Sequence, residues 1–414
     1  MNEHKTSQVF NLDPESELRF EVNEKDEKVT LELKNGLAEV FGAELIKGKK
    51  YEFGFGHKIG VFTWQGCTVE FTGKTVAFVE KKTPMALYLN CHAALERMRE
   101  FAEKDNSTGP IVMIAGPQDV GKSTLTKIFL NYAARMGRRP TFVDLDVGQG
   151  QITIPGIIGA LPIDKPSDVV DGFNTQGSVG FHFGHKGPGM NMPLYNHLVS
   201  RIAEVCSDRM EANKKEKAGG IIINTCGWIL KKGYRILTHI AQAFEVDVII
   251  VLDHEKLYNA LVKDIPDFVK VILLPKSSGV VNRGTPYRRI TRNLRIDEYY
   301  YGTKRTLTPH SFDVKWSDVK IFSVGPLSNS QEVSKNKATK LIPVVPGPNL
   351  KKHILSISLA DPNKDDIVQT NIAGFVCITN VDVAKQTMTI LSPLPGPLPN
   401  NVLLLSSITY PDDK

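Results

Sequence analysis

The sequence has few of the features that mark a secreted, membrane-spanning or zinc-binding protein. Its 414 residues include five cysteines and no CxxC pair, which is typical of reduced thiols in a cytosolic or nuclear protein and predicts no zinc site. No apolar run reaches the length of a membrane span, and the first ten residues, MNEHKTSQVF, lack the apolar core of a signal peptide. We therefore expect a soluble protein with no membrane partner.

Two signatures that divide nucleoside-triphosphate-using proteins into classes are also missing. The chain has no [NT]KxD motif, which argues against a guanine-specific GTPase, and no LSGGQ-type motif, which argues against a transporter-type ATPase. In addition, the apolar run that begins at Gly220 ends in Asn224 and Thr225, where many P-loop ATPases carry an aspartate. The net charge of +6 is mild and permits an anionic partner without demonstrating one.

Composition divides the chain into three regions, and 414 residues suffice for three cores. In residues 1–97, stretches such as ELRFEV alternate apolar and polar residues, and Asn35-Gly36 indicates a hairpin turn; we expect an N-terminal β-sandwich domain. Residues 306–414 are again β-like with Pro-rich breaks, which predicts a small C-terminal β domain. The stretch SNSQEVSKNKATK (327–339) resembles a mobile linker.

Residues 98–305 alternate short apolar strands with amphipathic helices. The strands are continuously apolar, as expected where both faces of a sheet are buried, and cover 111–115, 141–146, 220–224 and 246–253. One helix is expected from about Met85 to Lys104, and another after Lys122, ending near Gly137. The pattern predicts the α/β class, with a central P-loop NTPase domain whose parallel sheet has crossover helices, flanked by the two small β domains.

The stretch GPQDVGKST follows the apolar run IVMIA and opens a helix, which is the context of a phosphate-binding (Walker A) loop. Gly116 and Gly121 would let backbone N–H groups turn toward the phosphates, beside the positive end of the helix. Lys122 would bridge the β- and γ-phosphates, and Ser123 would offer a hydroxyl to Mg²⁺. The sequence therefore predicts a nucleotide site made of Gly116, Pro117, Gln118, Asp119, Val120, Gly121, Lys122, Ser123 and Thr124.

Acidic residues close the second strand of this region, in VDLDVGQGQ. Asp144 and Asp146 are two residues apart, so strand alternation predicts that both face the same side. Asp146 lies at the carboxyl end, where ligands bind in open α/β sheets, and could orient Mg²⁺ or accept a proton from an attacking hydroxyl, as a P-loop kinase requires. The alternative is a cap for the following turn, and this is our interpretation of the deeper Asp144.

The stretch over 274–302 is strongly basic and predicts a helix from Thr285 onward. On that helix Arg288, Arg292 and Arg295 would share a face. We interpret it as a lid whose guanidinium groups neutralise a transferring phosphoryl group, and the alternative is a solvated basic helix.

Two further features border the expected strand ends. NTCGW places Trp228 just before Lys231 and Lys232, where an indole either stacks on a base or ribose or packs in the core. The run GQGQ over 148–151 lacks side-chain bulk at two positions and either admits a substrate backbone or forms a turn.

Together these motifs resemble those of the polyribonucleotide 5′-hydroxyl kinases that serve tRNA splicing and mRNA 3′-end cleavage. The matching stretches are GPQDVGKST, DLDVGQGQITIPG, NTCGW, FEVDVIIVLD and LLPKSSGVV…YRR…R, and the similarity extends along essentially the whole chain through GLAEVFGAEL and VFTWQGC. The chain looks closest to the animal members. The resemblance implies three domains, ATP and Mg²⁺ as cofactors, and transfer of a phosphate to the 5′-hydroxyl end of RNA.

The resemblance also implies roles for single residues. The family's lysine falls on Lys122, its Mg²⁺-binding serine on Ser123, and its catalytic aspartate, a second Mg²⁺ ligand, on Asp146. The tryptophan that clasps RNA falls on Trp228, and we assign Gln151 to RNA binding beside it. The family's lid arginines fall on Arg283, Arg288 and Arg292. The residues that hold adenine fall on Glu17 and Lys58.

The sequence departs from the family pattern at two places. Gln118 occupies a loop position where a smaller residue, often threonine, is expected. The stretch GHKGPG replaces a more hydroxyl-rich segment around Lys186.

The family implies partners and a compartment as well. These are RNA with a 5′-hydroxyl end, the tRNA splicing endonuclease complex, subunits of mRNA cleavage factor II, and the nucleus. The alternative function is an ATP-bound scaffold subunit of the cleavage and polyadenylation machinery without turnover, as in some fungal members. Because Asp146, Trp228 and the lid arginines are all present, we favour an active kinase. A small-molecule kinase fits less well, since a tryptophan with neighbouring lysines and two β domains suits a polymer.

Overall fold

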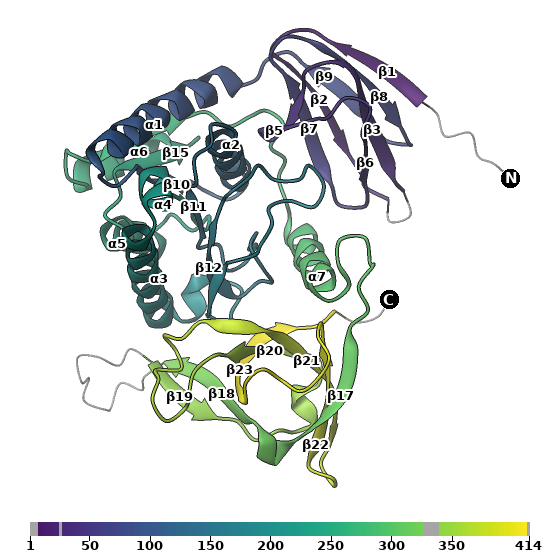
Figure 1. Cartoon of the computed structure of the whole chain (residues 1–414), viewed down its shortest axis with the longest axis vertical. Coiled ribbons are helices and arrows are strands. Elements are labelled where there is room, and N and C mark those ends of the chain that lie inside the picture. Colours follow the sequence, from purple (N-terminus) through teal and green to yellow (C-terminus); the bar gives the residue numbers. More distant parts are fainter. Residues whose placement is uncertain (1–6, 25–26, 327–338, 412–414) are drawn as a thin grey trace, which may run out of the picture.

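The structure is a computed structural model that describes residues 7–24, 27–326 and 339–411. The linker expected over 327–339 falls, except for its last residue, outside the described residues. Two β-rich parts flank a helix-rich centre, as Figure 1 shows. No helix in the described part of the chain is long and apolar enough to cross a bilayer.

The N-terminal part is a sandwich of two antiparallel sheets, as expected. One sheet has the order β1-β8-β3-β6 and the other β5-β4-β7-β2-β9. In β3 and β8 alternate residues, such as Leu31 and Val69, face the core that the two sheets share. The strands are β1 (Ser7–Leu12), β2 (Ser16–Glu21), β3 (Val29–Gly36), β4 (Glu39–Val40), β5 (Ala43–Glu44), β6 (Lys50–Phe53), β7 (Lys58–Thr63), β8 (Cys67–Thr72) and β9 (Ala77–Glu80).

The hairpin turn predicted at Asn35-Gly36 is wrong. Both residues end β3, where they pair with Thr68 and Cys67 of β8, and the chain then crosses to β4 in the other sheet. Gly36 has φ +79°, and a Cβ there would lie 2.4 Å from the carbonyl oxygen of Gly66. The glycine therefore serves a close approach between two backbones.

The central sheet has the order β13-β12-β11-β14-β10-β15-β16. Five strands are parallel: β10 (Ile111–Ala115), β11 (Thr141–Asp144), β14 (Ile221–Asn224), β15 (Val248–Leu252) and β16 (Lys270–Leu274). The first four were predicted, whereas β16 was not. Two antiparallel strands, β12 (Ile157–Pro162) and β13 (Val179–His182), extend it beyond the prediction. The connection from β11 to β12 contains no helix, and without a crossover helix the chain returns antiparallel.

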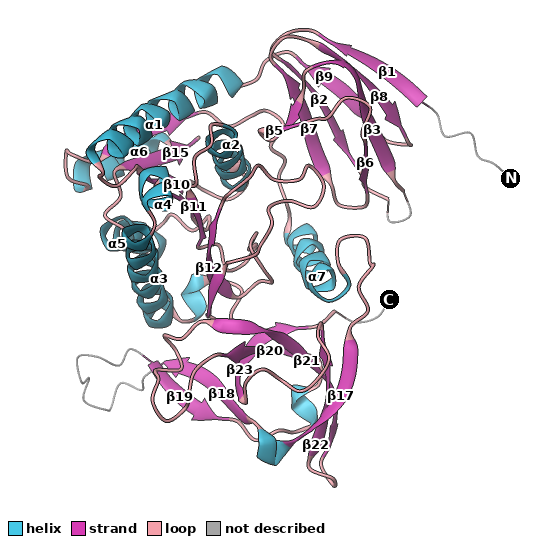
Figure 2. Cartoon of the chain, in the orientation of Figure 1, coloured by secondary structure: helices cyan, strands magenta, loops and turns pink. Residues whose placement is uncertain are grey.

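Helices cover both faces of this sheet (Figure 2). Alternate residues of β10 point to opposite faces: Val112 packs with α1 (Met85–Asp105) and α2 (Lys122–Arg135), whereas Met113 packs with the helices on the other side. Those helices are α3 (Met192–Ala212), α5 (Lys232–Ala243) and α6 (Glu255–Asp264), and the short α4 (Lys214–Gly219) follows α3. The expected domain boundary between residues 97 and 98 falls inside α1, and the division into 1–97, 98–305 and 306–414 stays a prediction.

Helix α7 (Thr285–Tyr301) follows β16 and leads into the C-terminal β part. That part is one sheet in the order β17-β22-β21-β20-β23-β18-β19. Its strands are β17 (His310–Lys315), β18 (Lys320–Pro326), β19 (Thr339–Pro343), β20 (His353–Ser358), β21 (Ile372–Asp382), β22 (Thr387–Ser392) and β23 (Val402–Thr409). Short 3₁₀ helices lie at η1 (Pro188–Met190), η2 (Trp316–Asp318) and η3 (Pro348–Leu350).

Candidate active site

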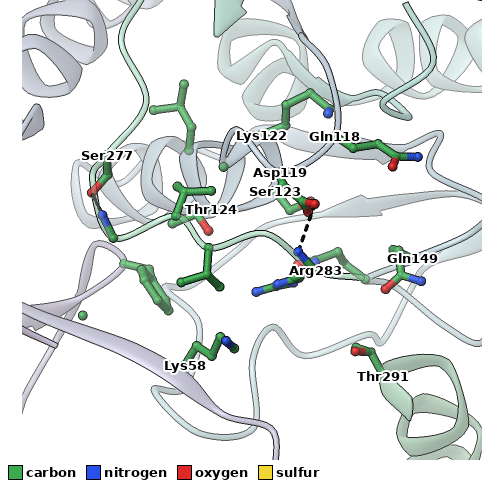
Figure 3. A pocket seen from close by; sticks show the side chains of 18 of the residues that line it. Lys58, Gln118, Asp119, Lys122, Ser123, Thr124, Gln149, Ser277, Arg283 and Thr291 are labelled. Carbon is green, nitrogen blue, oxygen red and sulfur yellow. Dashed lines mark hydrogen bonds between the residues drawn. The ribbon is translucent and has the colours of Figure 1, made fainter. Parts of the chain in front are cut away.

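A cavity of about 890 Å³ lies where the N-terminal sandwich, the carboxyl ends of the central strands and helix α7 meet. In Figure 3 the phosphate-loop side chains, Lys58 from β7 and Thr291 from α7 lie around it. Most of the predicted site residues line this cavity: Glu17, Lys58, Gln118, Asp119, Gly121, Lys122, Ser123, Thr124, Asp146, Gln151, Trp228, Arg283, Arg288 and Arg292. Gly116, Pro117 and Val120 are not among the lining residues. The cavity is thus lined by residues from the phosphate loop, the acidic strand end, the basic helix, the Trp228 segment and the N-terminal sandwich.

The phosphate loop joins β10 to α2, as expected, and its conformation depends on glycine at two points. Gly116 (φ +151°) approaches the Leu252 carbonyl, which would lie 2.9 Å from a Cβ. Gly121 has φ +90° and immediately precedes Lys122, the first residue of α2. The Lys122 ammonium donates to the Pro117 carbonyl at 2.6 Å. Burial lowers the pKa of Lys122, and the negative charge of Asp146 opposes that change.

Asp144 is buried and holds the loop after β11 in place. It accepts hydrogen bonds from the Gln151 N–H at 2.6 Å, the Asn224 amide at 2.9 Å and the Asp146 N–H at 3.2 Å. Burial raises the pKa of Asp144 to about 7, and the nearby Asp146 adds to the rise. These contacts fit the turn-capping interpretation of Asp144.

Asp146 lies two residues beyond the end of β11 and lines the cavity. Its Oδ1 accepts the N–H groups of Gly148 and Gln149 at 3.0 and 3.1 Å. No described residue donates to its Oδ2, so that oxygen can accept from a ligand. Burial raises the pKa of Asp146, and the positive charge of Lys122 acts against the rise.

Helix α7 presents a basic face to the cavity. Arg288, Arg292 and Arg295 all line it, which agrees with the face predicted from their spacing. Arg288 forms a 2.7 Å ion pair with Asp119 of the phosphate loop, and the Arg283 N–H donates to the same carboxylate at 3.0 Å. Asp119 therefore connects the phosphate loop to the segment that carries the arginines.

Trp228 is half-buried and lines the cavity. Its ring rests against backbone: a Cβ on Gly189 would lie 3.3 Å from the indole. Gln151 is exposed and lines the same cavity, with its N–H bound to Asp144. The remaining wall here is formed by Lys186, Gly187, Pro188 and Gly189.

The N-terminal side of the cavity contains a buried cation that the sequence interpretation missed. Arg19 donates to Glu17 at 2.8 Å and to the hydroxyls of Ser278 and Ser277 at 3.0 and 3.1 Å. It thereby joins the sandwich to the segment that leads into α7. The sequence did contain a sign of this cluster: Glu17, Arg19 and Glu21 alternate in β2 and so share one face.

Lys58 lies between the sandwich and α7. Its ammonium pairs with Glu21 at 2.7 Å and stands 5.2 Å from the centre of the Tyr287 ring. The Tyr287 hydroxyl in turn donates to the Gly56 carbonyl at 2.9 Å. These contacts bring the first turn of α7 against the N-terminal part.

The fold and the cavity define a three-part P-loop protein with a central nucleotide-binding α/β core. Three family models match successive segments of the chain: the N-terminal β-sandwich domain of polyadenylation factor over residues 11–102, the mRNA cleavage and polyadenylation factor CLP1 P-loop over 116–302, and the pre-mRNA cleavage complex II protein Clp1 over 307–412. The chain belongs to the Clp1 family.

Named relatives match over the full length of the chain. The polyribonucleotide 5′-hydroxyl-kinase Clp1 of Gallus gallus is 52% identical over 100% of this chain and 99% of its own. The human protein of the same name is 50% identical over the same shares. A solved structure described as the wild-type Clp1p–Pcf11p complex has a TM-score of 0.85 at 24% identity and covers 99% of both chains. At that identity the likeness shows the fold alone.

Proposed function

We propose that this protein transfers the γ-phosphate of ATP to the 5′-hydroxyl end of RNA. The observation that carries the proposal is the convergence of a phosphate-loop lysine, a carboxylate, lid arginines and a half-buried tryptophan on one cavity. The names of the animal relatives support it, since they are polyribonucleotide 5′-hydroxyl-kinases at about half identity over the whole chain.

The nucleotide would lie between the sandwich and the phosphate loop. The residues of 116–124 would hold the phosphates through backbone N–H groups and the Lys122 ammonium. Glu17 and Lys58, which line the cavity on the sandwich side, would hold the adenine. Arg19 would keep the Glu17 carboxylate in place, because it donates to it from a buried position.

The acceptor hydroxyl would be activated by Asp146. Its Oδ2 can accept the proton of that hydroxyl, and its raised pKa makes it a better base than an ordinary aspartate. Arg283, Arg288 and Arg292 would stabilise the charge on the phosphoryl group during transfer. Trp228 would stack on the RNA near its 5′ end, with Gln151 and Lys186 beside it.

The donors present fit a magnesium ion. The Ser123 hydroxyl and the Asp146 carboxylate line the same cavity, and both offer the hard oxygen ligands that Mg²⁺ takes. A bound Mg²⁺ would supply positive charge to the phosphate oxygens.

We further propose that the protein works in the nucleus, in pre-mRNA 3′-end processing and tRNA splicing. The solved neighbour in complex with Pcf11p supports assembly with a cleavage factor II subunit. Assembly with the tRNA splicing endonuclease complex follows from the family resemblance. The alternative is a scaffold that binds ATP without turnover.

One experiment decides between the kinase and the scaffold. The purified protein is incubated with γ-labelled ATP and a 5′-hydroxyl RNA oligomer, and the matched control is the same RNA with a 5′-phosphate. The kinase predicts label on the 5′-hydroxyl RNA alone. If the protein binds ATP but no label appears on RNA, the result would support the scaffold function instead.

A further inference from the structure

The wall of the cavity next to Trp228 is built on the C-terminal β part. This wall belongs to the 184–189 loop, which follows β13 and contributes Lys186, Gly187, Pro188 and Gly189 to the cavity. A Cβ on Gly148 would lie 2.7 Å from the Lys186 carbonyl, so the loop runs directly beside the turn that holds Asp146. A small shift of this loop would therefore alter the space beside both Trp228 and Asp146.

The first residue of that loop is fixed by strand β23. The Gly184 carbonyl oxygen accepts the Ser407 N–H at 2.9 Å, the Ser407 hydroxyl at 2.9 Å and the Ser406 hydroxyl at 3.1 Å. A carbonyl oxygen has two lone pairs, and here three donors share it. These contacts restrict the position of Gly184 relative to β23. The Ser407 hydroxyl also lies 3.1 Å from Nδ1 of His185, the next residue of the loop.

A second contact lies one strand away. His182, the last residue of β13, is buried, and its Nδ1 lies 2.7 Å from the Ser356 hydroxyl of β20. Burial lowers the pKa of His182 to about 3, so its ring is neutral at physiological pH and exchanges a neutral hydrogen bond with the serine. The residues before and after Phe183, His182 and Gly184, are therefore both hydrogen-bonded to the C-terminal sheet.

Helix α7 is anchored in the same C-terminal part. The Phe375 N–H of β21 donates to the Tyr299 hydroxyl at 3.0 Å. Ile296 and Tyr300 are buried in a cluster with Ile354, Phe375 and Ile408 of the C-terminal sheet. Ile154, from the connection after Asp146, and Ile157, the first residue of β12, belong to the same cluster. The C-terminal part therefore contacts the lid, the Asp146 connection and the 184–189 loop together.

We propose that the C-terminal β part positions the acceptor side of the active site, with Ser407 and Ser406 as positioning residues that act through Gly184. The proposal rests on the proposed kinase function for its kinetic readout. It assigns these serines to RNA placement and leaves ATP binding to the phosphate loop and the N-terminal sandwich.

The test uses the full chain with Ser407→Ala and with the double variant Ser406→Ala, Ser407→Ala. We expect KM for 5′-hydroxyl RNA to rise roughly fivefold in the double variant, the size of one net hydrogen bond, while KM for ATP stays unchanged. Ser407→Thr keeps the hydroxyl and should restore the wild-type value. Ser311→Ala, at an exposed serine of β17, is the matched control.

Hydrogen exchange and RNA binding separate this proposal from the kinase assignment. Backbone amides of the 184–189 loop should exchange faster in both variants, and RNA affinity should fall, whether or not the protein turns over ATP. If the double variant does not fold, Ser407→Ala carries the test, since residue 407 is exposed. Unchanged RNA affinity and unchanged exchange in that loop, or a parallel rise in KM for ATP, would overturn the proposal.

Discussion

Asp119 in the phosphate loop and Arg288 in helix α7 form a 2.7 Å ion pair across a sequence separation of 169 residues. The same carboxylate accepts the Arg283 N–H. This pair joins the loop proposed to hold the phosphates to the helix proposed as the lid. An incoming phosphate would compete with Asp119 for the Arg288 guanidinium, so nucleotide binding and the position of the lid are expected to be coupled.

Arg288→Ala should lower kcat strongly and change RNA affinity little. A guanidinium that stabilises charge only during transfer contributes to the transition state and not to substrate binding. Arg289→Ala is the matched control, because Arg289 is exposed on the same helix and does not line the cavity. Equal effects of the two substitutions on kcat would return α7 to the role of a solvated basic helix.

Lys122→Ala should remove phosphate transfer. Lys122 is the only lysine of the phosphate loop. Loss of one such electrostatic contact raises the activation free energy of transfer by about 3 kcal/mol or more. Label transfer to RNA measures the effect, with circular dichroism to confirm folding and Lys127→Ala, from the same helix, as the control. Near-wild-type turnover by folded Lys122→Ala protein would contradict the kinase assignment.

Asp146→Asn should stop transfer while ATP still binds. The substitution keeps the shape of the side chain and its acceptor for the Gly148 and Gln149 N–H groups, but it removes the negative charge and the basicity. ATP affinity is measured by titration calorimetry and transfer by the label assay. A parallel collapse of ATP affinity would mean that the residue serves mainly as a Mg²⁺ ligand or a structural group.

Trp228→Ala should weaken RNA binding by about 1–3 kcal/mol, the usual contribution of one base–aromatic stack, and leave ATP affinity unchanged. Trp316→Ala is the control, since Trp316 lies in η2 and does not line the cavity. Trp228 also packs against a hydrophobic cluster, so melting temperatures are compared as well. Early melting with unchanged RNA affinity would assign this tryptophan to the core.

Stability should fall as the pH drops below 6.5, in part through His182. Its pKa is about 3 in the folded protein against an ordinary 6.5, so between these values the unfolded chain binds the additional proton. Each pH unit in that window then costs about 1.4 kcal/mol of unfolding free energy. In urea unfolding at pH 7 and 5, His182→Gln should show a smaller loss than wild type or than His310→Gln, at an exposed control position. Equal losses would show that folding does not lower the pKa of His182.

Local sequence patterns were sufficient for much of this molecule. The phosphate loop, the apolar strands around it, helix α1, helix α2 and the arginine helix could be predicted because each depends on spacing within a few residues. The boundaries shifted only slightly, as at β11, which ends at Asp144 where the apolar-acidic run suggested 146. The roles of individual site residues remain predictions that the experiments above test.

Contacts between distant segments were decided by the tertiary structure alone. Patterns along the chain were enough to predict a nucleotide-binding P-loop core between two β-rich parts, since backbone conformation and burial period are local properties. It could not determine that Asn35-Gly36 would continue a strand, that β12 would return antiparallel, or that Arg19 would join Glu17 to Ser277. Nor could it place Ser407 on the carbonyl of Gly184, 223 residues earlier. Such contacts depend on how the finished sheets pack, and no spacing along the chain encodes which carbonyl will lie opposite which hydroxyl.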